Sequence, residues 1–385
     1  MPTPALTHAD SCSDPSGEPA GDESPDYLKR QLITYLGNKR ALLGPINDAV
    51  QTVKRRLGSS TLSASDLFTG TGVVARSLKR HCDRLIVNDL EAYARVTAAC
   101  YLANRGNVDR AAVADAVRHV DARARDHPEP GYITELYSPR DDDDPQPGER
   151  VFYTRRNAMV LDTARRAIDD LPAGLRPFVL APLLAQASVH VNTSGVFKGF
   201  YKDPATGRGK FGGAAGNALT RIRGDIALEA PVLSRFDCDT EIHQTDANAV
   251  ARELPAVDLA YLDPPYNQHP YGSNYFMLNL LVDGRRPADV SRVSGIPRDW
   301  NRSAYNRRTH ALPAFRNLLE NLNAKFVLVS FNSEGFISHE QMTTLLASRG
   351  RVTTVETTYN AFRGSRNLRG RPLHVTEYLY LLERD

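Results

Sequence analysis

The stretch D-L-F-T-G-T-G, residues 66–72, decides the fold that this 385-residue sequence predicts. Its first three residues are typical of a strand, and its two glycines are typical of a tight turn. The apolar run that follows, residues 73–78, has the pattern of a helix, and residues 85–89 have the pattern of a second strand. Strands and helices that alternate in this way predict an α/β fold with a mostly parallel sheet.

Further patterns extend this prediction in both directions. Apolar residues at steps of three, four and seven predict an amphipathic helix from residue 42 to Gly58. Strands are predicted near residues 257–263, 326–331, 351–359 and 374–382. Between about 100 and 235 the pattern changes to two helical stretches, 152–171 and 176–190, an acidic loop at 141–147 and a basic, glycine-rich segment at 193–224. We interpret this part as an inserted domain.

The composition is that of an ordinary globular protein, with 41% hydrophobic and 24% charged residues and a mean hydropathy of −0.40. Neither an apolar run of about 18 residues nor a secretory signal pattern is present, so we expect a cytoplasmic protein without a membrane span. The four cysteines are scattered and form no C-x-x-C pair. Neither a disulfide framework nor a bound metal is therefore expected.

Charge is distributed unevenly along the chain. Residues 1–28 contain six acidic residues and no Lys or Arg, so the other 357 residues carry a formal charge of +9. Because residues 1–31 are rich in Ser, Pro, Gly and Asp, we predict a disordered acidic tail there. The basic body behind this tail favours a polyanionic partner such as nucleic acid.

The glycine turn indicates a nucleotide-like ligand. Gly70 and Gly72 let the backbone approach a ligand closely, and Asp89 is placed to bind ribose hydroxyls. These features fit NAD as well as S-adenosylmethionine. Asp66 separates the two, because its carboxylate would repel a pyrophosphate but attract the ammonium and sulfonium groups of S-adenosylmethionine. The alternative is that Asp66 only caps a helix and the glycines only form a turn.

A second motif, D-P-P-Y at residues 263–266, follows an apolar strand and is therefore expected at the carboxyl edge of the sheet. Pro264 and Pro265 restrict the backbone and remove N–H donors, which leaves a carboxylate, fixed carbonyl groups and an aromatic ring. Asp263 and the Pro264 carbonyl are suited to accept the two N–H bonds of an exocyclic amine that is to be methylated. Tyr266 is suited to stack on a base flipped out of a duplex. A proline turn with a capping Asp is the alternative.

These motifs, in this order, resemble those of S-adenosylmethionine-dependent DNA methyltransferases that act on the N6 amine of adenine. The run Y-L-G-N-K-R at residues 35–40 is similar to the N-terminal cofactor motif of their alpha group. The resemblance spans roughly residues 32–383 and implies a Rossmann-like, mostly parallel seven-stranded sheet with an inserted, largely helical target-recognition domain. The expected divisions are the tail at 1–31, the cofactor half of the catalytic domain at 32–110, the target-recognition insertion at 111–240 and the D-P-P-Y half at 241–385.

The resemblance also implies roles for individual residues. Tyr35 and Lys39 would contact the methionine end of the cofactor. Asp89 would hold the ribose, and Asp246 would lie near the adenine of the cofactor. Phe68 and the two glycines of the turn would form the floor of the site. The predicted cofactor-binding residues are thus Tyr35, Lys39, Asp66, Phe68, Gly70, Gly72, Asp89, Asp246 and Asp263, and the predicted catalytic residues are Asp263, Pro264, Pro265 and Tyr266.

Contacts to double-stranded DNA are expected from three basic stretches. The segment 193–224 mixes cations with aromatic side chains, as a loop near a phosphate backbone should, although a solvated loop is the alternative. A second stretch follows the catalytic motif, and a third is predicted to be an exposed loop between the last two strands. The predicted DNA-binding residues are Lys198, Lys202, Arg208, Lys210, Arg221, Arg223, Arg302, Arg307, Arg308, Arg363, Arg366 and Arg369.

Other functions stay open at this point. An RNA adenine methyltransferase would share both motifs, but the long insertion between them disfavours it. An N4-cytosine DNA methyltransferase would use the same chemistry, but that group more often has Ser in place of Asp263. A NAD-dependent oxidoreductase would need a hydride-handling site that we do not find. We expect a monomer, and the sequence leaves open the recognition site and whether a cognate restriction endonuclease accompanies the enzyme.

Overall fold

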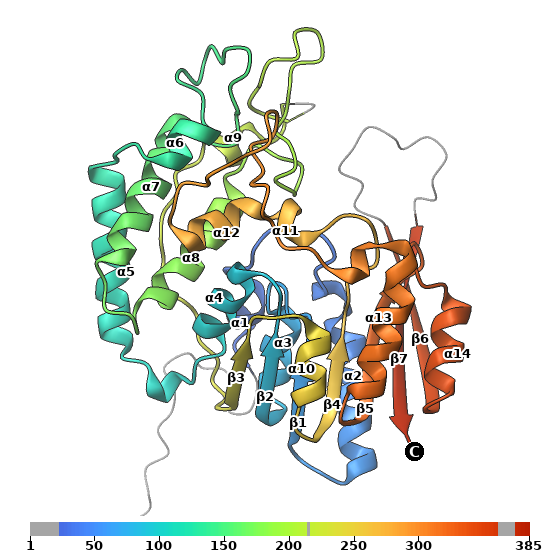
Figure 1. Cartoon of the computed structure of the whole chain (residues 1–385). Coiled ribbons are helices and arrows are strands. Elements are labelled where there is room, and N and C mark those ends of the chain that lie inside the picture. The colour runs from blue at the N-terminus through green and yellow to red at the C-terminus, as the bar shows by residue number, and fades with distance from the viewer. Residues whose placement is uncertain (1–22, 214–215, 361–373) are drawn as a thin grey trace, which may run out of the picture.

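The computed structural model describes residues 23–213, 216–360 and 374–385 (Figure 1). Seven strands form one sheet in the order β3-β2-β1-β4-β5-β7-β6. The strands are β1 (Leu62–Asp66), β2 (Cys82–Asn88), β3 (Asp239–His243), β4 (Val257–Leu262), β5 (Ala324–Asn332), β6 (Gly350–Asn360) and β7 (His374–Arg384). The first five pair in parallel, and β7 runs antiparallel to both of its neighbours, β5 and β6. The predicted α/β, mostly parallel seven-stranded sheet is confirmed.

The chain order reverses at β1, which lies between β2 and β4. After β1 the chain builds β2 and β3 on one side and later adds β4 and β5 on the other. Side chains and loops that leave the carboxyl ends of β1 and β4 therefore diverge. Such a switch point is where open α/β sheets bind ligands.

Helices pack on both faces of the sheet (Figure 1). The residues of β4 alternate between the faces: Leu259 and Tyr261 join one apolar cluster, and Ala260 and Leu262 join the other. One cluster includes α2 (Leu43–Leu57), α3 (Val73–Lys79) and part of α4 (Ala92–Tyr101). The opposite cluster includes α10 (Ala247–Glu253), α13 (Arg308–Asn321) and α14 (His339–Ala347).

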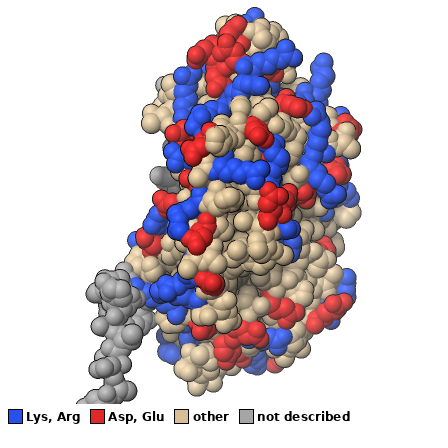
Figure 2. Space-filling view, turned by 90° about the vertical axis from the view of Figure 1, so that its left-hand side faces the viewer, with Lys and Arg blue, Asp and Glu red and all other residues tan. Residues whose placement is uncertain are grey.

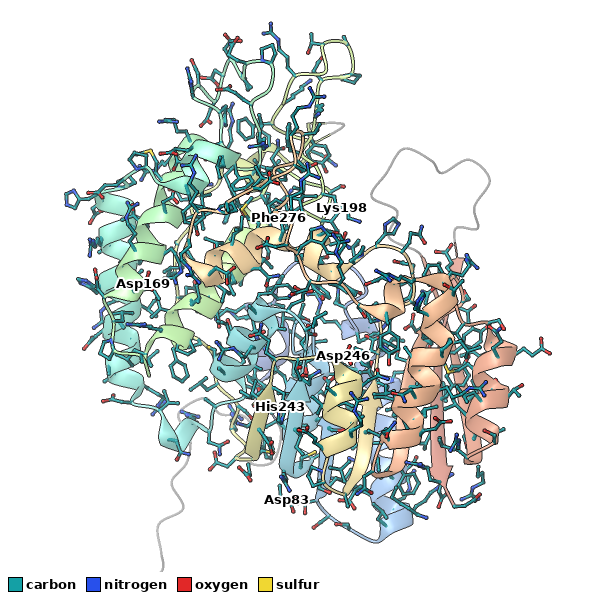
Figure 3. The ribbon with its side chains drawn as sticks, viewed as in Figure 1. Asp83, Asp169, Lys198, His243, Asp246 and Phe276 are labelled. Atoms are coloured by element: carbon teal, nitrogen blue, oxygen red, sulfur yellow. The ribbon has the colours of Figure 1, made fainter. Side chains whose placement is uncertain are left out.

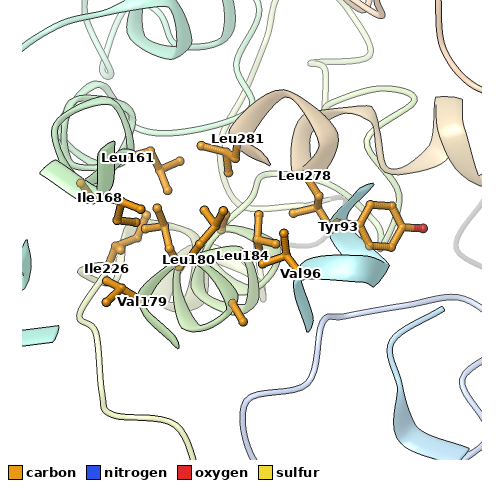
Figure 4. Close-up of a cluster of buried hydrophobic side chains, with 14 of the residues drawn as sticks. Tyr93, Val96, Leu161, Ile168, Val179, Leu180, Leu184, Ile226, Leu278 and Leu281 are labelled. Atoms are coloured by element: carbon orange, nitrogen blue, oxygen red, sulfur yellow. The ribbon is translucent and has the colours of Figure 1, made fainter. Parts of the chain in front are cut away.

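A helical half adjoins the edge of the sheet that β3 forms (Figure 1). Its main helices are α5 (Arg110–Asp126), α6 (Tyr132–Tyr137), α7 (Arg155–Asp169) and α8 (Arg176–Val189). Further short α-helices among the described residues are α1 (Pro25–Lys29), α9 (Leu219–Arg223), α11 (Tyr271–Asn274) and α12 (Phe276–Asp283). Leu161, Leu180 and Leu184 lie at the centre of the core of this half, where Leu278 and Leu281 of α12 meet them (Figure 4).

The core of the helical half crosses the domain boundaries that the sequence predicts. Val96 of α4 lies before residue 111 and Leu281 of α12 lies after residue 240, yet both pack in this core (Figure 4). The physical reason is that α12 is apolar along most of its length, so it must be covered on more than one side. The insertion at 111–240 therefore does not pack as a separate unit.

Most predicted elements are confirmed. The predicted helices at 42–57, 152–171 and 176–190 are α2, α7 and α8 with small shifts at their ends, and Gly58 ends α2 in the left-handed conformation. The four strands predicted after residue 240 are β4 to β7. Among the described residues, no helix is both long and apolar enough to cross a membrane.

Two predictions need correction. The strand before the glycine turn ends at Asp66, and Leu67 and Phe68 belong to the turn, because the Asp66 carboxylate accepts the Phe68 N–H at 3.3 Å. The predicted tail extends too far, since α1 is ordered and Tyr27 is buried with its hydroxyl donating to the Tyr101 carbonyl at 2.7 Å. Pro25 starts α1, and the aromatic ring supplies apolar surface that the rest of the tail lacks. Residues 1–22 lie outside the described part of the chain.

Candidate active site

The carboxyl ends of β1, β2 and β4 border a cavity of about 850 Å³, including its open mouth. We call it the donor cavity. The predicted residues that line it are Tyr35, Lys39, Asp66, Phe68, Gly70, Asp89, Asp246 and Asp263, and Pro265 lines it as well. Gly72 is not among the lining residues but begins α3 directly behind the turn.

The glycine turn has a backbone that only glycine adopts easily. Gly70 has a φ of +53° and Gly72 a φ of +78°. A Cβ on Gly70 would lie 3.4 Å from the ring of Tyr35, so the turn packs directly against this ring. Tyr35 in turn stacks on both Tyr271 and Tyr275, with ring centroids 5.0 and 4.4 Å away. The turn and this aromatic stack therefore form one rigid wall of the donor cavity.

Asp66 reaches the donor cavity from the end of β1. Its Oδ1 accepts the Phe68 N–H, whereas its buried Oδ2 has no hydrogen-bond partner among the described residues. Burial raises the pKa of Asp66 well above its usual value. Burying a carboxylate oxygen without a hydrogen-bond partner costs free energy of folding. Its presence in a cavity wall therefore points to a cationic or hydrogen-bond-donating group on a ligand.

Asp89 and Glu91 stand side by side at the end of β2. Asp89 accepts the Gly70 N–H at 2.7 Å and the Glu91 N–H at 2.9 Å, so it holds the glycine turn in place. Glu91 also lines the donor cavity, and its Oε2 accepts from the side-chain amides of Asn279 and Asn301. Burial raises the pKa of Asp89 to about 6 and that of Glu91 to about 7. Glu91 is not among the residues predicted from the sequence, although an acidic residue two positions after Asp89 was a visible signal.

Asp246 begins α10 as its N-cap, with Oδ1 accepting the Asn248 N–H at 2.9 Å. It also lines the donor cavity, so the capping and the ligand interpretations apply together. Figure 3 shows Asp246 at the carboxyl edge of the sheet and Lys198 above it, among the loops of the helical half.

The D-P-P-Y motif follows β4 directly, as predicted. Burial raises the pKa of Asp263 to about 7, although the nearby Lys39 acts in the opposite direction. Lys39 Nζ lies 3.1 Å from Asp263 Oδ1 and 2.6 Å from Glu377 Oε1. Lys39, predicted to contact the cofactor, is therefore also bound to the predicted catalytic carboxylate. The main chain of Tyr266 is held by the Phe336 N–H, which donates to its carbonyl at 2.8 Å.

A second cavity lies beyond the same motif, and we call it the acceptor cavity. Pro265 and Tyr271 line both cavities, whereas Tyr266 lines only the acceptor cavity. Lys198 also lines it, and burial lowers the pKa of this lysine. The D-P-P-Y motif thus separates two cavities, one on the side of the glycine turn and one on the side of the helical half.

Several predicted DNA-binding residues pair with the acidic loop at 141–147. Arg223 lies 3.0 Å from Asp143, and Arg208 lies 3.7 Å from Asp144. Lys210 lines the same hollow between the two loops. These loops project together from the helical half (Figure 1). The cations of this segment therefore face carboxylates of the same chain.

Arg221, one of the predicted DNA-binding residues, makes structural hydrogen bonds within the chain. Its half-buried guanidinium donates to the carbonyls of Val191 and Thr193 at 2.9 and 3.4 Å, and also to that of Val189. These bonds fix the start of the basic segment. The sequence alone does not distinguish Arg221 from exposed Arg223, because the distinction depends on which side of α9 meets the segment.

The other predicted DNA-binding residues are exposed or lie outside the described residues. Arg302 stacks on Trp300 at 4.2 Å and Arg308 on Phe336 at 4.9 Å, near residues that line the donor cavity. The remaining members of this group are Lys202 and Arg307, which are exposed, and Arg363, Arg366 and Arg369, which lie outside the described part of the chain. On the side formed by the helical half, cations and anions are interspersed, and no continuous basic surface is visible there (Figure 2).

The strand order, the glycine turn and a D-P-P-Y motif between two cavities define a methyltransferase that acts on amino groups of nucleic-acid bases. The chain belongs to the D12 class N6 adenine-specific DNA methyltransferase family, whose family model matches residues 35–345. It is therefore an enzyme that methylates adenine in DNA. The RNA, cytosine and dinucleotide alternatives that the sequence left open are not supported.

Two similar proteins are type II methyltransferases of about the same length. The chain is 28% identical over 361 residues to type II methyltransferase M.CviAII of Paramecium bursaria Chlorella virus 1, covering 91% of this chain and 98% of that protein. It is 26% identical over 363 residues to type II methyltransferase M.NlaIII of Neisseria lactamica, covering 91% and 99%. Type II methyltransferase M.FokI of Planomicrobium okeanokoites is 22% identical and matches 92% of this chain with 53% of its own length.

Proposed function

We propose that the methyl donor is S-adenosylmethionine, that it binds in the donor cavity, and that the target adenine enters the acceptor cavity after leaving the duplex. The observation that carries this proposal is the position of the D-P-P-Y motif, with Asp263 lining the donor cavity, Tyr266 the acceptor cavity and Pro265 both. A base must leave the stack to reach such a site.

The residues of the donor cavity fit the groups of S-adenosylmethionine. Oδ2 of Asp66, which has no hydrogen-bond partner in the described part of the chain, suits the ammonium group. The carboxyl groups of Asp89 and Glu91 suit ribose hydroxyls. Asp246 and the ring of Phe68 lie in the same wall and suit the adenine end. When bound, the donor supplies a methyl group on a sulfonium sulfur, so that a C–N bond forms, the C–S bond breaks with its electron pair left on sulfur, and the amine loses one proton.

In this proposal the protein orients the amine and receives its proton. Asp263 Oδ2 and the Pro264 carbonyl accept the two N–H bonds of the adenine amine, which turns its lone pair toward the donor cavity. Tyr266 stacks on the base and offsets part of the cost of unstacking, which is a few kcal/mol. Asp263, with a pKa of about 7, takes up the proton after transfer.

The test uses Asp263→Ala and the unaltered enzyme with S-adenosylmethionine and duplex DNA. We expect the unaltered enzyme to form N6-methyladenine, seen by mass spectrometry of nucleosides, and Asp263→Ala to lose at least about a thousandfold in rate while still binding the donor in calorimetry. Normal turnover by Asp263→Ala, or methylation without any donor binding, would overturn the proposal.

We also propose that the enzyme acts as a monomer within a restriction-modification pair. The support is that several similar proteins are named type II methyltransferases or modification methylases. Sedimentation velocity of the purified chain tests the first part. DNA from cells that express the chain should resist a cognate endonuclease, and cleavage at every site would contradict the second part.

A further inference from the structure

Glu377 on β7 belongs to the centre of the site, although no motif includes it. It is 1% exposed, and its Oε1 accepts Lys39 Nζ at 2.6 Å. Ser330 Oγ donates to the same oxygen at 2.8 Å, and Asn332 Nδ2 donates to Oε2 at 3.3 Å. Both of these partners come from β5, so Glu377 is fixed within the sheet.

Lys39 is held between two carboxylates. Its side chain is 5% exposed, and its Nζ contacts Glu377 on one side and Asp263 on the other. Burial opposes a charge on Lys39, but the two carboxylates outweigh this effect and hold the pKa of Lys39 well above its usual value. A buried lysine that stays charged in this way acts as a fixed hydrogen-bond donor and does not release a proton.

This arrangement leaves the two oxygens of Asp263 in different states. Oδ1 is engaged by Lys39, whereas none of the described residues donates a hydrogen bond to Oδ2. The Asp263 side chain is 19% exposed, so its free oxygen is within reach of a ligand. A lysine that was free to move would compete with the adenine amine for both oxygens.

We infer that Glu377 is a positioning residue for methyl transfer: by anchoring Lys39 it confines the lysine to Oδ1 of Asp263 and keeps Oδ2 available for the target amine. This inference rests on the proposed role of Asp263. Glu377 itself touches neither the donor cavity nor the acceptor cavity.

The charge on Glu377 also acts on the ionisation of Asp263. The titratable groups that face Asp263 are Lys39, Asp66, Tyr261, Tyr266, Tyr271 and Glu377. Burial raises the pKa of the three tyrosines, so they are neutral at pH 7. Glu377 raises the pKa of Asp263 by charge repulsion, and Lys39 lowers it.

The experiment measures single-turnover methylation of duplex DNA by Glu377→Gln from pH 5.5 to 9. We expect the maximal rate to fall by about tenfold or more, because Lys39, which donates to Oδ1, is no longer held in one place. The dissociation constant of S-adenosylmethionine should change little. The acidic limb of the rate profile should move to lower pH, because removing the Glu377 charge removes a repulsion that disfavours ionised Asp263. A purely structural role would not move this limb.

The matched control is Glu383→Gln, on the same strand, where Glu383 pairs with Arg56 and Arg351 away from the site. It should keep the rate and the pH profile of the unaltered enzyme. Lys39→Met and the double variant Lys39→Met/Glu377→Gln complete a cycle in which Glu377→Gln should cause no further loss of the maximal rate once Lys39 is removed. Circular dichroism verifies that each variant is folded.

Three outcomes would overturn the inference: an unchanged rate and pH limb in folded Glu377→Gln, equal losses in the Glu383→Gln control, or independent losses that multiply in the double variant. Each differs from failure of the proposed function, which would appear as normal turnover by Asp263→Ala.

Discussion

At the scale of single residues, Asp66 is the side chain whose burial most needs a ligand. It lies at the end of a buried strand, it is 1% exposed, and one oxygen has no partner among the described residues. Such a group lowers the folding stability of the ligand-free protein, so its presence indicates a functional requirement. Its position therefore says more about donor binding than the glycine turn does, because the turn fits several nucleotides.

We predict that Asp66→Asn binds S-adenosylmethionine about tenfold to a hundredfold more weakly. The substitution keeps the shape and the hydrogen bond from the Phe68 N–H but removes the charge, and a hydrogen bond to a charged group contributes about 1.5–3 kcal/mol. Titration calorimetry measures the change.

Asp83→Asn is the matched control for this measurement, because Asp83 is exposed at the opposite end of the sheet (Figure 3). Its donor affinity should equal that of the unaltered enzyme. Equal affinity in Asp66→Asn as well would show that Asp66 does not hold the cationic end of the donor.

The sequence predicted much of the donor cavity, because its motifs directly follow apolar strands and parallel strands end at one edge. It did not predict Glu377, which lies 338 positions from Lys39. A signal was present, since Glu377 has the same strand phase as Val375 and Leu379, which are buried. An acidic residue on the face of a strand that otherwise carries buried apolar side chains indicates a buried partner. The identity of that partner depends on the tertiary fold.

At the scale of elements, periodicity predicted helices such as α2 and α7 well, since each has a marked apolar side. The predicted ends of elements were less accurate where a single side chain, and not the apolar periodicity, determines the end. The end of β1 depends on a hydrogen bond of Asp66, and α1 depends on the burial of one tyrosine. Neither effect is visible in an apolar pattern.

The short helix α9 carries two arginines with different tasks, and this gives a prediction. Arg221→Ala should lower the free energy of unfolding by about 1–3 kcal/mol, because it leaves backbone carbonyls of Val191 and Thr193 without their donor. Urea denaturation measures the loss. Arg223→Ala removes the same charge but only an exposed ion pair with Asp143, so we expect a loss of no more than about 1 kcal/mol. Equal stability of the two variants would contradict the assignment.

At the scale of the whole molecule, we propose that DNA contacts are concentrated near the cavities. The side formed by the helical half mixes both signs (Figure 2), whereas Arg302, Arg307 and Arg308 are exposed beside residues of the donor cavity. Phosphate contacts release counterions, so they set how steeply affinity falls with salt.

We predict that Arg302→Gln/Arg307→Gln/Arg308→Gln weakens DNA binding at low salt and lowers the salt slope by about 0.9 for each phosphate that the variant no longer neutralises. Binding isotherms at four or more salt concentrations measure the slope. The control neutralises Arg118, Arg123 and Arg125, which are exposed on α5, and should leave the slope unchanged. An identical slope in both triple variants would remove the first set from the interface.

The reversed direction of β7 has a consequence for the chemistry of the whole enzyme. Glu377 pairs with Asn332 at the last residue of β5, so the amino-terminal part of β7 lies where the parallel strands finish. In a seventh strand of the opposite polarity, the same residue would lie about 20 Å farther down the sheet, out of reach of Lys39. One inverted strand thus brings Glu377 to a reaction site whose other residues all come from earlier in the chain.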